Sequence, residues 1–177
     1  MRKGKVSPAA APSGDRGDHR EHREQAAIPA IGEGKRGESG HLGYLLRQAA
    51  GGFRLCLERA LADVDVTQPQ FMVMTMIAAY PGASNADLAR LALLTPQTLS
   101  TIIANLLRAG IVSRHPHAVH GRIQQLQLTE AGTKLLAKCR DRVARLEARL
   151  QGDLAPDEEQ ILRRWLVKVA LIGRAED

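Results

Sequence analysis

A short polar stripe in the middle of the chain carries side chains suited to hydrogen bonding with another molecule. Over residues 96–109, apolar side chains recur at three- and four-residue spacing and predict a helix with one buried face. Its other face carries amides, hydroxyls and a guanidinium, with Ser100 at the border: Gln97, Thr98, Thr101, Asn105 and Arg108. Amides pair with adenine, and hydroxyls bond several bases or pack on a thymine methyl group. The stripe therefore predicts contact with base edges in a DNA major groove, although an ordinary solvated helix also fits it.

The segments around this helix follow the order of a winged helix-turn-helix. Ser84 caps a short preceding helix, Thr95 caps the polar helix itself, and Gly110 ends it. Residues 111–114 and 123–128 then predict two strands. The hairpin tip between them is basic and contains Arg114, His115, His117, His120 and Arg122. Arginine at such a tip can enter a narrow minor groove, whereas the same hairpin without a preceding polar helix would indicate a solvated loop.

Helices are also predicted on both sides of this module. Residues 42–61 carry apolar side chains at helical spacing, and Gly51-Gly52 interrupts the pattern, where we expect a bend or a close helix contact. Other helix starts are marked by capping residues or by a proline in the first turn: Thr67 with Gln70, Thr129, and Pro156.

Composition limits the class of partner. The chain has 177 residues, a formal net charge of +6 and a pI of about 9.8, which favours an anionic partner such as nucleic acid. Aromatic residues make up only 3%, too few for stacking on single-stranded bases. Residues 1–40 are rich in Gly, Pro and charge and predict a disordered tail with no secretory signal. We predict no membrane span, and two cysteines without a disulfide framework fit a reducing cytoplasm.

Taken together, these segments resemble the MarR family of bacterial transcriptional regulators. The resemblance runs from about residue 42 to the C-terminus and rests on LGYLLRQA, VTQPQF, NADLARL, TPQTLSTIIANLLRAGIVSR and GRIQQLQLTEAG. It implies a mainly α fold with a small β-ribbon (α+β), in which residues 66–128 form the winged helix-turn-helix. Residues 41–65 and 129–177 would supply dimerisation helices. The implied function is a homodimeric repressor that binds a pseudo-palindromic operator in double-stranded DNA and responds to a small aromatic or phenolic effector.

One wing position departs from the family pattern of Asp-x-Arg, five residues, then Leu-Thr. Arg122, Leu128 and Thr129 match in register, but His120 stands at the Asp position. In the family that Asp looks like a brace for the wing arginine, and a histidine cannot brace it as an anion. His120 would instead contact phosphate itself or leave the arginine to another partner. This departure alone supports an alternative function, a winged-helix protein-interaction module without DNA binding.

Two sets of site residues follow. The candidate DNA-binding residues are Asn85, Thr95, Gln97, Thr98, Ser100, Thr101, Asn105, Arg108, Arg114 and Arg122. The resemblance places an effector pocket near the start of the first helix and the second helix, with candidates His41, Tyr44, Arg47, Met72 and Met76. Arg47 beside Tyr44 would suit a phenolic carboxylate. A solvated arginine and core-filling methionines are the alternative interpretation.

The remaining reactive side chains suggest weaker hypotheses. Cys56 makes a redox-responsive regulator an alternative, although it lies deeper in the first helix than the sensor cysteines of the family. Cys139 lies among Lys138, Arg140 and Arg142, which can lower its pKa, and a surface cysteine without a function is the competing interpretation. The wing histidines lack a carboxylate and make a poor metal site. Without paired carboxylates, a Ser-His-Asp pattern or a Gly-rich phosphate loop, we predict no enzyme, metal or cofactor.

Overall fold

The computed structural model describes residues 28–116 and 124–172, which belong to two compact units, residues 1–41 and 42–177. In the first unit, the described residues contain one turn of 3-10 helix, η1 (Gly34–Arg36). The prediction of a disordered tail over residues 1–40 stays a prediction, because most of that segment lies outside the described residues.

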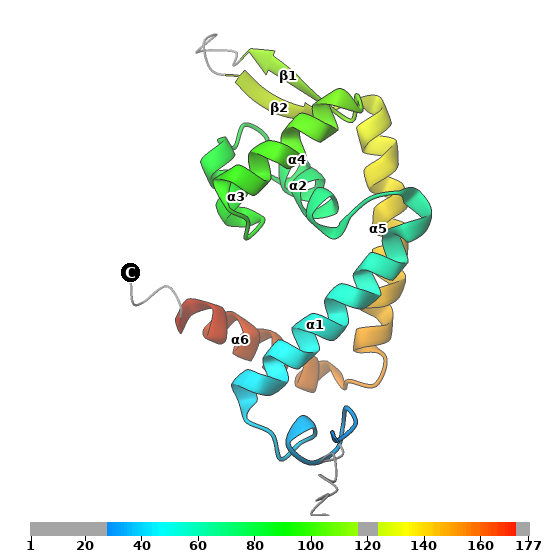
Figure 1. Ribbon diagram of the computed structural model, residues 1–177, viewed down its shortest axis with the longest axis vertical. Coiled ribbons are helices and arrows are strands. Elements are labelled where there is room, and N and C mark those ends of the chain that lie inside the picture. The colour runs from blue at the N-terminus through cyan, green and yellow to red at the C-terminus, as the bar shows by residue number, and fades with distance from the viewer. Residues whose placement is uncertain (1–27, 117–123, 173–177) are drawn as a thin grey trace, which may run out of the picture. The chain divides into compact units, whose positions relative to one another are not determined.

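The second unit is mainly helical with one small antiparallel ribbon, which confirms the predicted fold class (Figure 1). Its elements are α1 (Leu42–Leu61), η2 (Ala62–Val64), α2 (Gln68–Ala79), α3 (Asn85–Leu91), α4 (Pro96–Arg108), β1 (Val112–Pro116), β2 (Gln124–Leu128), α5 (Glu130–Gln151) and α6 (Pro156–Ile172). The register of the ribbon places Val112 opposite Leu128 and Pro116 opposite Gln124. Within the described ranges, none of the helices combines the length and apolar character that crossing a membrane requires.

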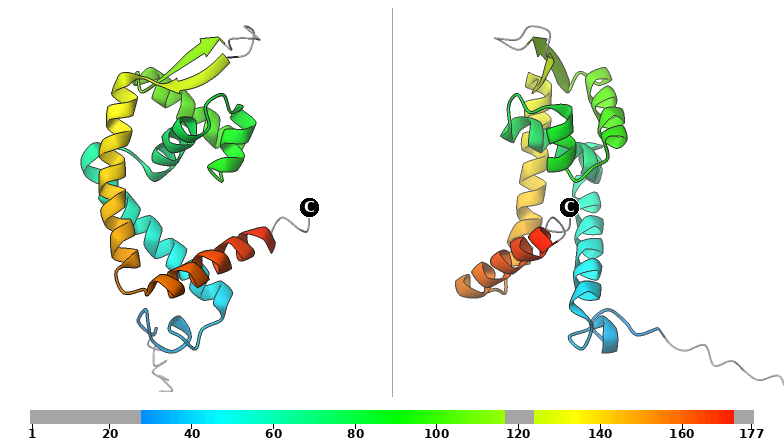
Figure 2. Two further views of the ribbon diagram at one scale, coloured as in Figure 1. Left: turned by 180° about the vertical axis from the view of Figure 1, so that it is seen from behind. Right: turned by 90° about the vertical axis from the view of Figure 1, so that its left-hand side faces the viewer.

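The core of this unit lies beneath α4. Val73 and Met74 of α2 are fully buried, and Leu88 of α3 and Leu99 of α4 pack in the same cluster. α5 runs from the ribbon to the start of α6 and contacts both α1 and α2 along the way (Figure 2). The core therefore fixes α4 from below and leaves its opposite side to solvent.

Local capping explains where the helices begin. Thr67 and Gln70 form the predicted capping box, and the side chains of Ser84 and Thr95 each accept a hydrogen bond from the backbone N–H three residues later. A helix leaves its first N–H groups without backbone partners, and these side chains satisfy one of them at each start. The predicted helix starts are thus confirmed.

Thr129 joins three elements at one point. Its hydroxyl accepts a hydrogen bond from the Gly132 N–H at 3.0 Å and lies 2.7 Å from the Gly110 carbonyl oxygen. Its backbone N–H donates to the Ile111 carbonyl at 3.0 Å. Gly110 has a positive φ of 68°, as predicted for a left-handed terminator. The end of α4, the approach to β1 and the start of α5 are therefore held together by one residue.

The structure contradicts one of the two alternatives expected at Gly51-Gly52, and the expected position of Cys139. A Cβ built on Gly51 or Gly52 meets nothing within 4 Å, so the described part of this chain makes no close helix contact there, while the expected bend stays a prediction. Cys139 is fully buried on α5 and not at the surface. Burial raises the pKa of the Cys139 thiol and outweighs the opposing charge of Arg142. Its basic neighbours in sequence do not activate it.

The turn between α3 and α4 holds a strained leucine. Leu93 has a φ of 55° and is 87% exposed. A residue with a Cβ is disfavoured by roughly 1–2 kcal/mol in this left-handed conformation, whereas glycine adopts it freely. We expect Leu93→Gly to stabilise the protein by about 1 kcal/mol, because no packing is lost with an exposed side chain. The urea midpoint of unfolding measures the effect. Leu93→Ala keeps the Cβ, so an equal gain in that variant would contradict the strain explanation.

Candidate nucleic-acid interface

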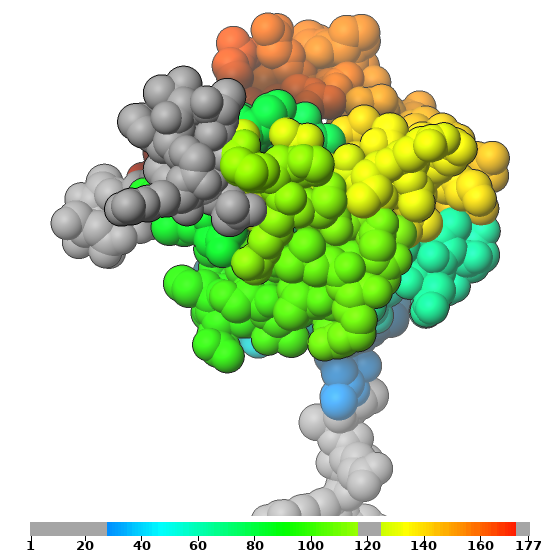
Figure 3. All heavy atoms as spheres, turned by 90° about the horizontal axis from the view of Figure 1, so that it is seen from above, coloured from blue at the N-terminus to red at the C-terminus, as the bar shows by residue number. Residues whose placement is uncertain are grey.

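The polar stripe of α4 lies on the surface, as the spacing predicts. Leu99, Ile102, Ile103 and Leu106 form the underside of the helix and are between 1% and 8% exposed. The outward residues are all exposed: Gln97, Thr98, Ser100, Thr101, Asn105 and Arg108. Seen from above, α4 and the ribbon lie next to each other on one face of the second unit (Figure 3). A helix and a hairpin are therefore available to the same partner.

Two of the three hydroxyl groups of this stripe already donate their hydrogens to backbone carbonyls. Ser100 donates to the Pro96 carbonyl at 2.9 Å, and Thr101 donates to the Gln97 carbonyl at 3.2 Å. The hydroxyls of Thr95 and Thr98 lie 2.8 Å apart and bond each other. Since a hydroxyl oxygen keeps acceptor capacity after donating, Ser100 and Thr101 present acceptors and methylene or methyl groups outward. Such groups suit the amino hydrogens of adenine or cytosine and the methyl group of thymine.

Asn105 and Arg108 form a joint group at the end of the stripe. Arg108 Nη1 donates to Asn105 Oδ1 at 2.9 Å, and both side chains are exposed. The bond orients the amide so that its NH₂ group and one further lone pair remain for a partner. That pair of groups matches the N7 acceptor and N6 donor of adenine in the major groove.

The helix before the stripe contributes a fixed charge pair. Asp87 accepts a hydrogen bond from the Ser84 hydroxyl at 2.6 Å and also binds Arg90. The Ser84 hydroxyl and the Arg90 guanidinium hold the pKa of the Asp87 carboxyl below its ordinary value. Arg90 is thus engaged at this helix, while Asn85 is exposed as the first residue of α3.

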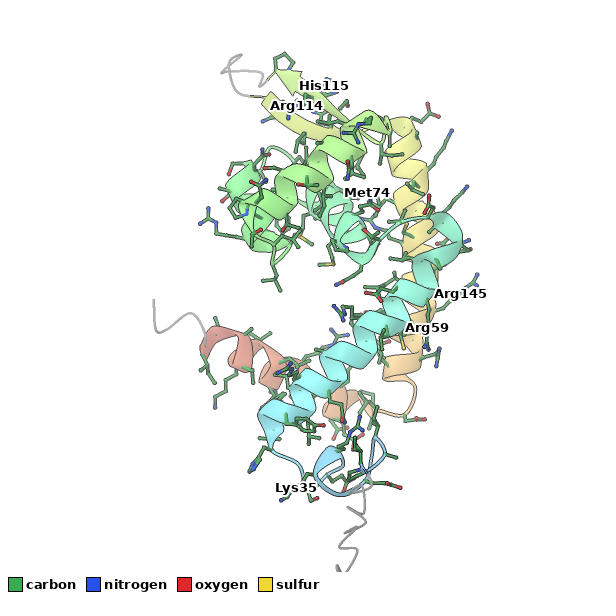
Figure 4. All side chains as sticks on the ribbon, viewed as in Figure 1. Lys35, Arg59, Met74, Arg114, His115 and Arg145 are labelled. Atoms are coloured by element: carbon green, nitrogen blue, oxygen red, sulfur yellow. The ribbon has the colours of Figure 1, made fainter. Side chains whose placement is uncertain are left out.

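The ribbon corrects one detail of the predicted wing. Arg114 and His115 lie within β1 and not at the tip, and both are exposed (Figure 4). The Ser113 hydroxyl lies 2.9 Å from Nε2 of His115. Arg122 and the other two wing histidines, His117 and His120, lie outside the described residues. The DNA-contacting roles of the wing residues stay predictions.

The candidate effector residues fall into three places. Tyr44 and Arg47 are exposed on the first turns of α1, and Met72 and Met76 are half-buried on α2 against the core. His41 belongs to the first unit. The effector site over these residues stays a prediction. Among the residues that the structure describes, no cluster of three or more His, Cys, Asp or Glu side chains can hold a metal ion.

Sequence reasoning missed a basic groove between α1 and α5. It has a volume of about 650 Å³ and is lined by several arginines, among them Arg59 of α1 and Arg145 of α5. The signal on α5 was present in the sequence, because arginines 142, 145 and 149 recur at helical spacing. Their partner on α1 is distant in sequence, and the pairing of the two helices is visible only in the structure.

Comparisons with known proteins agree with this geometry. A model described as the MarR family matches residues 64–123. The chain is 33% identical over 128 residues to the HTH-type transcriptional repressor Rv2887 of Mycobacterium tuberculosis, covering 72% of this chain and 92% of that protein.

Solved structures of that relative are also similar. The Rv2887 structure in complex with DNA superposes with a TM-score of 0.59 at 31% identity and covers 73% of this chain and 98% of the relative. The complex with salicylic acid gives a TM-score of 0.61 at 32% identity, over 75% of this chain and 98% of the relative. With its helix order, capped starts and ribbon in place, the chain belongs to the MarR family.

Proposed function

We propose that this protein is a dimeric, sequence-specific DNA-binding repressor that responds to a small aromatic or phenolic effector. The observation that carries the proposal is the polar outer face of α4, which is exposed over its whole length above a buried apolar underside. The similar protein Rv2887 is named a transcriptional repressor and has structures with DNA and with salicylic acid. Base readout by α4, with phosphate contacts from Arg108, Arg114 and Arg122, fits this role and requires no enzymatic activity.

A second copy of the chain is the proposed partner of the outer helices. α6 contains no buried residue, and its exposed apolar side chains include Ile161, Val167 and Leu171. Soluble proteins rarely leave a whole helix of this kind in water, so pairing with another protomer explains the pattern. In this proposal residues 66–128 bind DNA, and residues 41–65 and 129–177 form the dimer. Two copies of α4 would then read two half-sites one helical turn apart.

The alternative without DNA binding rests on His120, which lies outside the described residues. No observation on the described ranges favours that alternative or a redox role for Cys56.

The proposal is tested by binding to a pseudo-palindromic duplex, selected from the DNA upstream of the gene. We expect Asn105→Ala to weaken binding by about 1–3 kcal/mol and to relax preference at one base pair of each half-site. Fluorescence anisotropy with single-base variants of the site measures both effects. Affinity should also fall steeply as salt rises, because phosphates are neutralised by arginine and lysine.

The matched control is Gln68→Ala, which removes a half-buried amide from the first turn of α2, outside both α4 and the proposed dimer helices. We expect its operator affinity and base preference to equal those of the unmodified protein. Equal behaviour of the two variants, or binding with no salt dependence, would contradict readout by α4.

A further inference from the structure

The groove between α1 and α5 is lined by charged side chains around an apolar floor. The residues that define the α1–α5 groove are Arg59, Asp63, Arg142, Arg145, Leu146 and Arg149. Arg59 and Arg145 project on the same side of the unit, where α1 crosses α5 (Figure 4). Leu146 is 6% exposed and forms the floor, together with the half-buried Cys56. The groove therefore offers guanidinium groups around a small apolar surface.

The positive charge of the groove is mostly uncompensated. Four arginines line it, and Asp63 is its single carboxylate. Arg142 already binds this carboxylate: its Nε donates to Asp63 Oδ1 at 2.9 Å, and its Nη2 donates to Asp63 Oδ2 at 2.6 Å. Within the described ranges, no hydrogen bond or ion pair holds Arg59, Arg145 or Arg149. Like charges gathered on one wall repel one another, and a bound anion removes that repulsion.

The Asp63–Arg142 pair is an internal example of carboxylate binding by a guanidinium in this groove. The fork of Arg142 grips both carboxylate oxygens, and this hydrogen bonding holds the pKa of Asp63 below its ordinary value. The nearby charge of Arg145 lowers it further. A planar guanidinium binds carboxylate and phosphate oxygens in the same way, so the free arginines can receive either group.

We propose that the α1–α5 groove binds an organic oxyanion that carries two or more negative charges. The three free guanidiniums require more than one charge to be neutralised, and Leu146 and Cys56 give a carbon skeleton a surface to rest on. The volume of about 650 Å³ accommodates a molecule of the size of a tricarboxylate or a small organic phosphate. This site lies at the end of α1 and shares no residue with the predicted effector site, which comprises His41, Tyr44, Arg47, Met72 and Met76.

Binding in the groove has a consequence for the connection between α1 and α2. Asp63 lies in η2, which joins these two helices, and Arg142 ties it to α5 across 79 residues of sequence. An anion among the arginines competes with Asp63 for the N–H groups of Arg142. The ligand therefore loosens the link between η2 and α5. This effect on operator binding rests on the proposed function, whereas anion binding itself does not.

The test is calorimetry on the full chain without DNA, with citrate as the carboxylate probe, pyrophosphate as the phosphate probe and benzoate as a monovalent comparison. We expect one site per chain for citrate or pyrophosphate and much weaker binding of benzoate. Arg145→Gln and Arg149→Gln each remove one guanidinium, and each should lower the affinity for citrate or pyrophosphate about tenfold. Arg140→Gln is the matched control, because it removes the same charge from an exposed position of α5 outside the groove.

A second pair of variants separates a built site from general attraction to a basic protein. Asp63→Asn removes the competing carboxylate and should tighten probe binding about threefold or more. Asp65→Asn removes an exposed charge two residues away and outside the groove, so it should change little. The proposal would be overturned if the groove variants and their controls, Arg140→Gln and Asp65→Asn, changed probe affinity equally. It would also be overturned if the unmodified protein bound neither citrate nor pyrophosphate. Because DNA is absent from this experiment, a failure of anion binding would not contradict the proposed operator binding. Likewise, a failure of operator binding would not contradict anion binding.

Discussion

Placing glutamate at both Val167 and Leu171 of α6 is expected to turn the dimer into a monomer. The two side chains are 60% and 56% exposed in the single protomer, so glutamate at these positions should not destabilise the fold of one chain. In the proposed dimer they would bury carboxylates without partners, which is costly. A monomer would engage one half-site at a time, and operator affinity would fall by about 10²–10⁴-fold. Sedimentation equilibrium measures the mass, and anisotropy measures the affinity.

Leu93→Glu is the control for this change. Leu93 is 87% exposed in the turn before α4, so the same chemical replacement is made outside the proposed dimer helices. Its mass should remain that of a dimer, whatever happens to DNA affinity. A dimer that survives both changes on α6 would show that this helix does not pair two protomers.

Gly132→Ala is expected to destabilise the protein by about 3 kcal/mol, at the upper end of typical overpacking effects. A Cβ at this position would lie 2.1 Å from the Ile111 carbonyl oxygen, so the backbone of either α5 or the approach to β1 would have to move. The same movement would break the cap in which the Gly132 N–H donates to Thr129. Urea unfolding gives the loss of stability, and operator binding should weaken as the ribbon is displaced from α4.

Gly152→Ala provides the comparison at the other end of α5. Gly152 has a φ of −53°, and a Cβ there would meet only ordinary contacts at 3.5 Å. Alanine at a compatible backbone position is neutral or stabilises by up to about 1 kcal/mol, because the unfolded chain loses freedom. If both glycine variants lost equal stability, the close approach at Ile111 would not be the cause.

Local signals in the sequence predict most of the helix starts between residues 66 and 130 and the two faces of α4. Thr67, Ser84, Thr95 and Thr129 each cap a helix within three residues of their own position, so their effect does not depend on the rest of the chain. The buried and exposed faces of α4 follow equally from spacing, because a helix of known start fixes which residues face the core. These features need no knowledge of how distant segments meet.

The errors arise where distant segments meet. Cys139 has basic neighbours in sequence, yet adjacent residues on a helix point in different directions, and its own side faces the core with Leu136 and Leu146. The α1–α5 groove depends on which residues of α1 oppose the arginines of α5, and the Asp63–Arg142 pair joins positions 79 residues apart. Periodicity shows that a helix has a face but does not identify what lies against it.

The hydrogen bonds of Thr129 couple the position of α5 to that of α4. One end of this helix is tied at the last turn of α4 and the approach to β1, through the carbonyls of Gly110 and Ile111. Its middle carries Arg142, and its far end leads to α6. Because these hydrogen bonds join the start of α5 to the residues that follow α4, a tilt imposed at the far end of α5 would be transmitted to the C-terminal end of α4, the helix proposed to read the duplex. A change in protomer spacing and a change in helix orientation would then be the same motion.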